Sequence, residues 1–261
     1  MSITLKQPIA VVAAFAFPAV ALAGPGAVFS DDFSDGVIGL QWTQLADNPL
    51  DLAIIEENGQ VGVMANGFGA LTDDALYLSN GSAGFRLSTA DPFNMQLDYS
   101  YATTADVSSP LEGLALVFGV GVDTDGQDSA AIGFGTANAG IGNLTGATVA
   151  FRVDDAQTVS LPDTTVSSTG TFVIDYAPDT DTLTFSTNDG FSDDLTGLVQ
   201  GIWGTDALFV SFGARGNGFA TDQFNSFFDN FVINTGTLVA VPEPASVGLI
   251  AFGGLALRRR R

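Results

Sequence analysis

The sequence predicts an all-β protein built as a two-sheet antiparallel β-sandwich. Apolar and polar residues alternate with a period of two in many short runs, which is the pattern of half-buried strands. Clusters of Asp, Asn and Gly separate these runs at close spacing and predict tight turns. Between residues 24 and 240 no segment has the spacing of an amphipathic helix. Many short strands joined by close turns are typical of a sandwich.

The clearest strands can be placed from the alternation. In the run from Met95 to Tyr101, large apolar residues occupy every second position and polar residues the positions between them. The same pattern occurs at 147–153, 183–185 and 208–212. Near the end of the body of the chain (residues 24–240), one parity is occupied by Phe227, Asp229, Phe231 and Ile233, which places them on one face of a strand. Turns are expected at Asp35-Gly36, Asn58-Gly59, Asn80-Gly81, Asp123–Asp128, Asp179–Asp181 and Asn188–Gly190.

The first 23 residues have the features of a secretory signal peptide. Lys6 precedes an apolar stretch from Pro8 to Val20, and Ala21-Leu22-Ala23 follows as an A-x-A cleavage site. Cleavage after Ala23 would leave Gly24 as the first residue of the mature chain. The sequence therefore predicts export across the inner membrane.

The last 21 residues combine a rigid marker, an apolar run and a cationic end. The marker is Pro242-Glu243-Pro244, the apolar run extends from 245 to 257, and four arginines, Arg258, Arg259, Arg260 and Arg261, complete the segment. The two prolines bar a helix at the marker, and the arginines favour the cytoplasmic side of a membrane.

This tripartite order resembles the PEP-CTERM sorting signal of Gram-negative bacteria. The resemblance implies transient anchoring in the inner membrane, an exosortase-type processing enzyme as a partner, and delivery to the cell surface or extracellular matrix. The apolar run has 13 residues, whereas a full membrane span needs about 20. An ordinary short anchor without processing is the alternative. The sequence thus divides into a signal peptide (1–23), a sandwich domain (24–233), a linker (234–240) and a sorting segment (241–261).

The two ends of the body carry a second resemblance. The body opens with residues 31–36, Asp-Asp-Phe-Ser-Asp-Gly, and closes with residues 228–233, Phe-Asp-Asn-Phe-Val-Ile. Such ends are similar to those of concanavalin A-like (laminin G-like) jelly rolls. The resemblance implies that the first and last strands pair in one sheet. It also implies a concave sheet of the kind that often binds glycans.

Composition excludes several classes of function. Residues 24–240 hold 28 acidic residues and only Arg86, Arg152 and Arg215 as cations, which gives a net charge of −25. Nucleic acid is therefore a poor partner, and so are acidic polysaccharides unless a cation bridges them. The chain has no cysteine and no histidine, and its one lysine, Lys6, leaves with the signal peptide. These absences remove disulfides, the usual zinc ligands and the Ser-His-Asp triad.

The sequence predicts no catalytic residue. Retaining glycoside hydrolases of the jelly-roll group place alternating acids on one strand, in a Glu-x-Asp-x-(x)-Glu pattern, and this chain lacks it. Glu56 and Glu57 are adjacent, so on a strand they point to opposite faces. Glu112 stands alone. A polysaccharide lyase would need a histidine or lysine that the body does not contain.

One loop is a candidate for calcium. Asp123, Asp125 and Asp128 place three carboxylates within six residues, and Ca²⁺ takes oxygen ligands from such loops. The alternative is a polar hairpin turn between a strand that ends near Val122 and one that begins near Ala130.

An exposed tryptophan could serve as a platform for a sugar ring. Trp42 and Trp203 have apolar neighbours, so core packing is the expectation for both. Taken together, the sequence predicts a secreted, non-enzymatic matrix component or glycan-binding adhesin, with extracellular polysaccharide as a candidate partner. The alternative is a divergent carbohydrate-active enzyme on the same fold.

Overall fold

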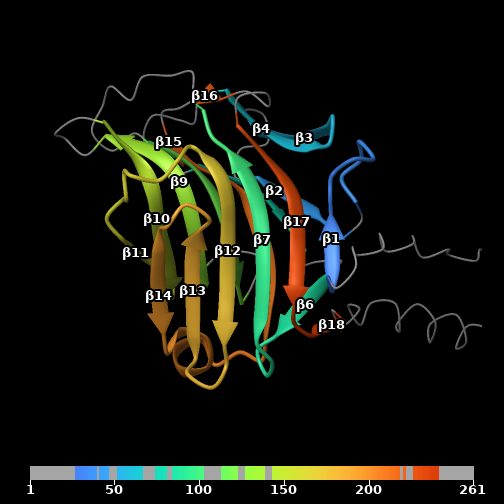
Figure 1. Cartoon of the computed structure of the whole chain (residues 1–261), viewed down its shortest axis with the longest axis vertical. Coiled ribbons are helices and arrows are strands. Elements are labelled where there is room, and N and C mark those ends of the chain that lie inside the picture. The colour runs from blue at the N-terminus through green and yellow to red at the C-terminus, as the bar shows by residue number, and fades with distance from the viewer. Residues whose placement is uncertain are drawn as a thin grey trace, which may run out of the picture.

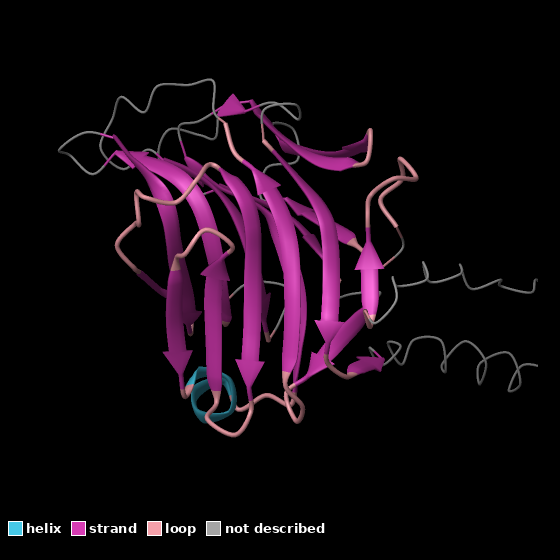
Figure 2. Cartoon of the chain, viewed as in Figure 1, coloured by secondary structure: helices cyan, strands magenta, loops and turns pink. Residues whose placement is uncertain are grey.

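A computed structural model of the chain describes residues 27–39, 41–46, 52–66, 74–80, 84–102, 113–122, 127–138, 143–217, 220–221 and 226–240. In these residues the protein is a sandwich of two antiparallel sheets, as Figures 1 and 2 show. The predicted fold class is confirmed.

Sheet A forms the front layer in Figure 1. Its strands follow the order β14-β13-β12-β7-β17-β4-β16, with β1 paired to β17 and β3 paired to β4. Their bounds are β1 Phe29–Asp31, β3 Leu52–Glu57, β4 Gln60–Asn66, β7 Phe93–Ser100, β12 Thr169–Ala177, β13 Thr182–Thr187, β14 Ser192–Thr196, β16 Ala220–Thr221 and β17 Phe227–Thr235.

Sheet B lies behind it. Its strands follow the order β11-β10-β9-β8-β15-β5-β2, and β6 joins β15 to β18. Their bounds are β2 Thr43–Ala46, β5 Asp74–Ser79, β6 Phe85–Ser88, β8 Gly113–Gly121, β9 Ser129–Asn138, β10 Asn143–Val153, β11 Ala156–Val159, β15 Ala207–Asn217 and β18 Leu238–Ala240.

The first strand, β1, lies beside the last long strand, β17, as the jelly-roll resemblance implied. In the β1–β17 pair Phe29 is opposite Ile233 and Asp31 is opposite Phe231. Residues 234–240, expected to be a linker, instead continue the sheets, because β17 runs to Thr235 and β18 pairs with β6. Both β1 and β18 lie on the right-hand side in Figure 1, so the two described ends of the chain leave the sandwich on the same side.

The core fills the space between the sheets with the apolar parity of each strand. Strand β7 alternates strictly between buried and half-buried positions along its length. Aromatic rings join the two layers. The Trp42 ring contacts Phe212 of sheet B at 5.0 Å and Phe231 of sheet A at 5.2 Å between centroids. Burial of this kind supplies most of the free energy that holds a sandwich together.

Strand β17 departs from the predicted parity. Asn230 adopts a positive φ of 49°, and the register with β7 shifts between Asp229 and Val232. This β-bulge reverses the faces. Phe228 is therefore buried at 0% exposure, together with Phe231, whereas Phe227 lies half-buried on the other parity. The expectation that Phe227 and Phe231 share one face was wrong.

The described residues contain one helical turn, the π-helix η1 at Leu198–Trp203. The carboxylate of Asp181 caps it, because it accepts the backbone N–H groups of Gln200 and Gly201 at 3.0 Å. The hydroxyl of Tyr176 donates to the same carboxylate at 3.1 Å. Burial and this neighbouring carboxylate raise the pKa of Tyr176 to about 12.

Candidate functional site

Several predicted site residues lie outside the described part of the chain. They are the signal cleavage residues (Ala21, Ala23, Gly24), the sorting motif (Pro242, Glu243, Pro244, Arg258–Arg261), Glu112, and two of the three candidate calcium ligands (Asp123, Asp125). Export and sorting therefore remain predictions. Within the described residues, no helix is long and apolar enough to cross a membrane.

Asp128 is the one candidate calcium ligand that the structure describes. The predicted hairpin is present, because β8 ends at Gly121 and β9 begins at Ser129. The Asp128 carboxylate accepts the backbone N–H of Asp154 at 3.0 Å, which ties this hairpin to the β10–β11 turn. Among the described residues, no group of three or more acidic side chains could hold a metal ion. Calcium binding stays a prediction that depends on Asp123 and Asp125.

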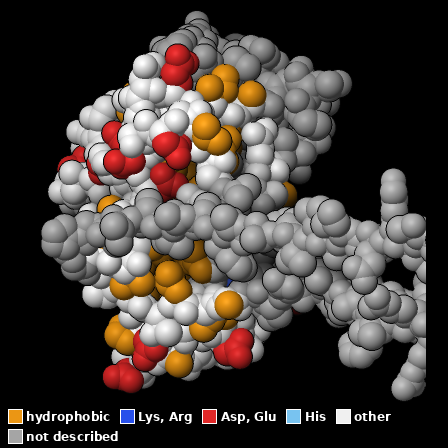
Figure 3. Space-filling view, turned by 90° about the vertical axis from the view of Figure 1, so that its right-hand side faces the viewer, with side chains coloured by type: hydrophobic (Ala, Val, Ile, Leu, Met, Phe, Trp, Pro, Cys, Tyr) orange, Lys and Arg blue, Asp and Glu red, His pale blue; other side chains and the backbone are white. Residues whose placement is uncertain are grey.

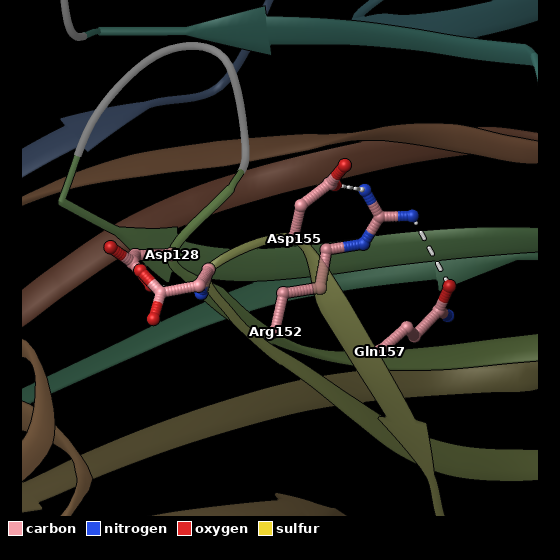
Figure 4. Close-up of polar contacts among 5 residues, drawn as sticks. Asp128, Arg152, Asp155 and Gln157 are labelled. Atoms are coloured by element: carbon pink, nitrogen blue, oxygen red, sulfur yellow. Dashed lines mark hydrogen bonds and ion pairs between the residues drawn. The ribbon is translucent and has the colours of Figure 1, made fainter.

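The neighbouring β10–β11 turn is held by its own ion pair. Arg152 donates to Asp155 at 3.1 Å and to Gln157 at 3.2 Å. Figure 4 shows the Asp128 carboxylate apart from this pair and turned away from it. Asp154 and Asp155 both have positive φ values, 49° and 67°, as a two-residue type I′ hairpin turn requires. These carboxylates therefore stabilise turns in the structure described.

The two tryptophans have different surroundings. Trp42 is 5% exposed, and its indole N–H donates to Asp31 at 2.8 Å, so the core prediction is confirmed for it. Trp203 is only partly buried against the core. Its indole N–H donates to the backbone oxygen of Arg152 at 3.3 Å, which places the end of η1 against strand β10.

The charged residues divide unequally between the sheets. The strands of sheet A carry eight carboxylates and no cation, from Asp31, Glu56, Glu57, Asp98, Asp175, Asp193, Asp194 and Asp229. The strands of sheet B carry one carboxylate, Asp74 at the start of β5, and all three arginines of the body. Among the strands, the acidic residues therefore lie mainly on sheet A, while most of the 28 acidic residues of 24–240 lie outside the described strands.

The outer face of sheet A is lined by hydrogen-bonded polar rows across β17, β7 and β12. In the first row, Asn230 donates to Asp98 at 3.0 Å and the Thr171 hydroxyl donates to Asp98 at 2.6 Å. In the second, Asn234 donates to Asn94 at 2.6 Å and Asn94 donates to Asp175 at 2.7 Å. Cross-strand pairs of this kind stabilise a sheet, and they occupy much of the hydrogen-bonding capacity of the face.

Two carboxylates face each other within the first row. Asp229 on β17 is directly opposite Asp98 on β7, so their Cβ atoms lie about 4.5–5.5 Å apart. Burial raises the pKa of Asp229, and the negative charges of Asp98 and Asp32 add to that effect, while the backbone N–H of Asn230 opposes it. Sequence reasoning missed this pair because its members are 131 positions apart.

A second perturbed carboxylate is Glu56 on β3. Its Oε1 accepts the backbone N–H groups of Gly36 at 3.0 Å and Val37 at 3.2 Å, and the residue is 9% exposed. Burial, reinforced by Asp35, raises the pKa of Glu56 to about 7. Glu57 is exposed, which confirms that the two glutamates point to opposite faces.

The outer face of sheet B is lined mainly by small residues. In β8 the outward positions between buried Leu116, Phe118 and Val120 include Val117 and Gly119. In β9 the outward positions include Ser129, Ala131, Gly133 and Gly135. This alternation was visible in the sequence as Gly and Ala between larger apolar residues.

Close strand contacts explain two of these glycines. A Cβ atom on Gly119 would lie 2.5 Å from the backbone oxygen of Ala130, and one on Gly133 would lie 2.9 Å from that of Leu116. Neither position has room for a side chain. Both glycines are themselves buried between their neighbours. The Phe209 ring lies on the same face beside Gly121, and Arg215 of β15 and Arg152 of β10 lie near opposite ends of the strands.

The surface has two further features. A shallow hollow of about 330 Å³ is lined by residues of the β6–β7 loop and of the segment around η1: Thr89, Ala90, Gln200, Gly204, Thr205 and Asp206. Its Gln200 amide and Thr89 hydroxyl already donate to backbone oxygens of the hollow itself. On the side where β1 and β18 lie, Figure 3 shows hydrophobic side chains gathered between acidic ones.

Comparisons with known proteins give a fold and no family. No protein-family model matches the chain, and no curated protein matches it. Solved structures match over most of their length. A CBM2 module of the evolved Dit protein of Lactobacillus casei BL23 phage J-1 is 12% identical over 80% of this chain and 94% of the module, with a TM-score of 0.52.

Two further structures are similar at the same level. Peanut lectin is 12% identical over 82% of this chain and 98% of the lectin, with a TM-score of 0.51. An immunostimulatory antigen and pseudo β-1,3-glucanase of Mycobacterium tuberculosis is 14% identical over 81% of this chain and 99% of that protein, also at 0.51. The fold is therefore the concanavalin A-like, lectin-like jelly roll. Its solved neighbours include both lectins and glucanase-like proteins.

Proposed function

We propose that this protein is a non-enzymatic carbohydrate-binding β-sandwich, exported and sorted to the cell surface or extracellular matrix. Three features support the binding role. The fold is one whose solved neighbours include lectins. The two sheets differ sharply in charge. The outer face of sheet B is lined by small residues and is free of carboxylates at its centre.

The observation that carries the proposal is this outer face of sheet B. A glycan chain presents hydroxyls and C–H surfaces, so it can lie against a face of backbone groups, Gly, Ala, Ser and Thr. The outward carboxylates of sheet A lie on the opposite side of the core from such a ligand, beyond the sheet spacing of about 10 Å. Salt screens solvent-exposed charges over about 8 Å, so sheet A weakens the binding of acidic glycans on sheet B without excluding it.

A pair of matched charge substitutions tests the site. Ala131→Asp adds a carboxylate to the outer face of sheet B, and Thr184→Asp adds one to the outer face of sheet A, both at half-buried positions. The full chain and both variants would be applied to a glycan array of neutral and acidic polysaccharides, with and without Ca²⁺. Loss of binding in Ala131→Asp alone is expected. Equal behaviour of the two variants, or no binding by the wild type, would contradict the proposal.

The export and sorting half of the proposal has its own test. Mass spectrometry of the protein recovered from its native host should find an N-terminus at Gly24 and no Arg258–Arg261 block. An intact arginine block would exclude processing by an exosortase-type enzyme, and it would leave the binding proposal untouched.

A second candidate function is a divergent glycoside hydrolase, and one observation favours it. A carboxyl group with a raised pKa opposite a second carboxylate is the pairing that retaining enzymes use, and Asp229 and Asp98 have this relation. Against it, Asp98 is already occupied by hydrogen bonds from Thr171 and Asn230. Release of reducing sugar from a polysaccharide panel, abolished by Asp98→Asn, would establish the enzyme.

A further inference from the structure

We propose that strand β11 is a docking edge at which two copies of this chain pair through their sheets B. The edge comprises residues 156–161 and is uncharged, with the sequence Ala-Gln-Thr-Val-Ser-Leu. It is independent of the glycan-binding proposal, because it concerns the rim of sheet B rather than its face.

The backbone of this edge is available for pairing. Ser160 donates its N–H to the oxygen of Val149 on β10 at 2.8 Å. Hydrogen-bonding directions alternate along an antiparallel strand, so Gln157 and Val159 turn their N–H and C=O groups away from β10. Beyond Ser160 the register with β10 shifts by one residue, because Asp163 pairs with Ala147. In the described part of the chain, no backbone group is seen to bond to the N–H groups of Gln157 and Val159. An unpaired row of donors and acceptors is a template for another strand.

Exposed apolar side chains gather at the same edge. Among the described residues, the large hydrophobic side chains that are exposed are Val28, Val37, Val159, Leu161 and Ile202. Val159 and Leu161, at 53% and 91% exposure, belong to the edge itself. Ile202 precedes Trp203, whose indole contacts the backbone of Arg152 on β10. Three of the five therefore lie at or beside one rim of sheet B.

The distribution of charge on the two sheets favours a second copy of the chain as the partner at the β11 edge. The other sheet also ends on this side, at β14, as Figure 1 shows. That edge strand carries Asp193 and Asp194, the kind of charge that protects an edge from pairing. Two copies that each carry an excess of acid on sheet A repel one another at such a surface. The uncharged β11 edge is where they can approach, and it lies on the far side of the sandwich from β1 and β18.

The edge is also complementary to itself. When two β11 strands pair antiparallel about a twofold axis at Val159, each Val159 faces its counterpart and each Leu161 faces a Gln157. Val159 then forms a hydrogen-bonded pair with its counterpart, and sheet B continues from one copy into the next. Only a short strand is shared, so the association is expected to be weak and reversible. Asp155 and Asp163 flank the strand at its two ends, so added salt should strengthen it.

A cysteine-free chain allows a direct test. The full-length protein in mild detergent would carry a single cysteine, either Val159→Cys or, as a control of the same residue type, Val37→Cys, which is 65% exposed in the loop after β1. Facing residues of a hydrogen-bonded pair have Cα atoms about 5.5 Å apart, within the range that a disulfide spans. Oxidation should convert Val159→Cys to covalent dimer at least several-fold faster than Val37→Cys.

Sedimentation velocity provides the second measurement. Wild type should show concentration-dependent dimer that increases with salt. Val159→Asp should remain monomeric, because it places like charges directly opposite one another, and Val37→Asp should behave as wild type. Since Val159 is exposed, both variants should keep the wild-type circular dichroism. Monomeric wild type at all concentrations, or equal cross-linking of the two cysteine variants, overturns the proposal.

Discussion

The outer faces of the two sheets differ although both cover the same core. Sheet A carries carboxylates joined into polar rows by Asn and Thr, and sheet B carries glycine and alanine in closely approaching strands. The inner faces show no such contrast, since both are lined by large apolar and aromatic residues. The inward positions of each strand therefore form a common core, and the outward positions of the same strands give the two sheets different surfaces.

A physical reason separates the two parities. Inward positions must fill the core at high density, so they accept only apolar residues of suitable size. Outward positions face water and can vary in charge with little effect on stability. A consistent bias among outward positions, such as the single acidic residue in the strands of sheet B, therefore calls for a functional explanation or for a steric one, as at Gly119.

The largest expected effect tests the shared core. Phe231→Ala should lower the free energy of unfolding by about 3–5 kcal/mol, because this ring is 0% exposed and packs against Trp42 and Phe212. Phe227→Ala, on the other parity of the same strand, should cost much less. Denaturant titration of both variants measures the difference. Equal losses would mean that β17 has no bulge and that the simple alternation was correct.

That bulge marks the limit of what the sequence could predict. Alternation located β7, β10, β13 and β15. Strands β7 and β13 keep a strict period of two, whereas in β15 Phe209 is buried between Leu208 and Val210. The local sequence does not predict the positive φ of Asn230, since asparagine also occurs with ordinary φ angles in turns and strands. A single residue in the left-handed region reversed the parity of the residues before it.

The next prediction concerns the glycine-lined face of sheet B. Gly119→Ala should destabilise the protein by about 1–3 kcal/mol, because the added methyl group meets the backbone of β9 at 2.5 Å. Gly201→Ala is the control, since its nearest atom is a carboxylate oxygen at 3.5 Å. Thermal or chemical unfolding measures both. If Gly119→Ala is neutral, small residues on this face are not a steric requirement, and a ligand becomes the better explanation for them.

A smaller effect concerns pH on the acidic sheet. The pKa of Glu56 is raised from 4.5 to about 7 in the folded state, so the fold favours the protonated form. This contribution to stability is complete below pH 4.5 and is lost as the pH rises through 7. Because solvent screens part of this effect, the contribution of Glu56 to the free energy of unfolding is about 1–2 kcal/mol.

The matched variants are the adjacent glutamates. Glu56→Gln should keep the acceptor for Gly36 and Val37 while removing the pH-dependent loss between pH 4.5 and 7. Glu57→Gln, at an exposed position, should leave the profile unchanged. A wild-type profile that does not decline relative to Glu56→Gln over this interval would contradict a raised pKa.

The candidate site was less predictable than the fold. The absence of a Glu-x-Asp-x-x-Glu pattern excluded one arrangement of acids along a single strand, and that exclusion needed only the sequence. The Asp98–Asp229 pair forms instead between strands that are neighbours only in the folded sheet. The segregation of charge likewise depends on which strands share a sheet, and strand order in a jelly roll is not a local property.

The smallest effect is a local one within the polar rows of sheet A. Asp98→Asn removes a negative charge opposite Asp229 while keeping an oxygen that can accept from Thr171. The substitution relieves the repulsion between residues 98 and 229, but it also weakens the hydrogen bond from Thr171, which is charge-assisted in the wild type. The two effects oppose each other, so the free energy of unfolding should change by less than about 1 kcal/mol. The informative readout is the pKa of Asp229, measured by NMR titration of its carboxyl carbon. It should fall toward its ordinary value but not reach it, because burial is the larger cause of the rise.

Asp194→Asn, on the same sheet at β14, should leave that pKa unchanged. If both variants move it equally, the field of the whole acidic face governs Asp229. In that case sheet A acts as a uniformly charged surface rather than as a set of specific pairs.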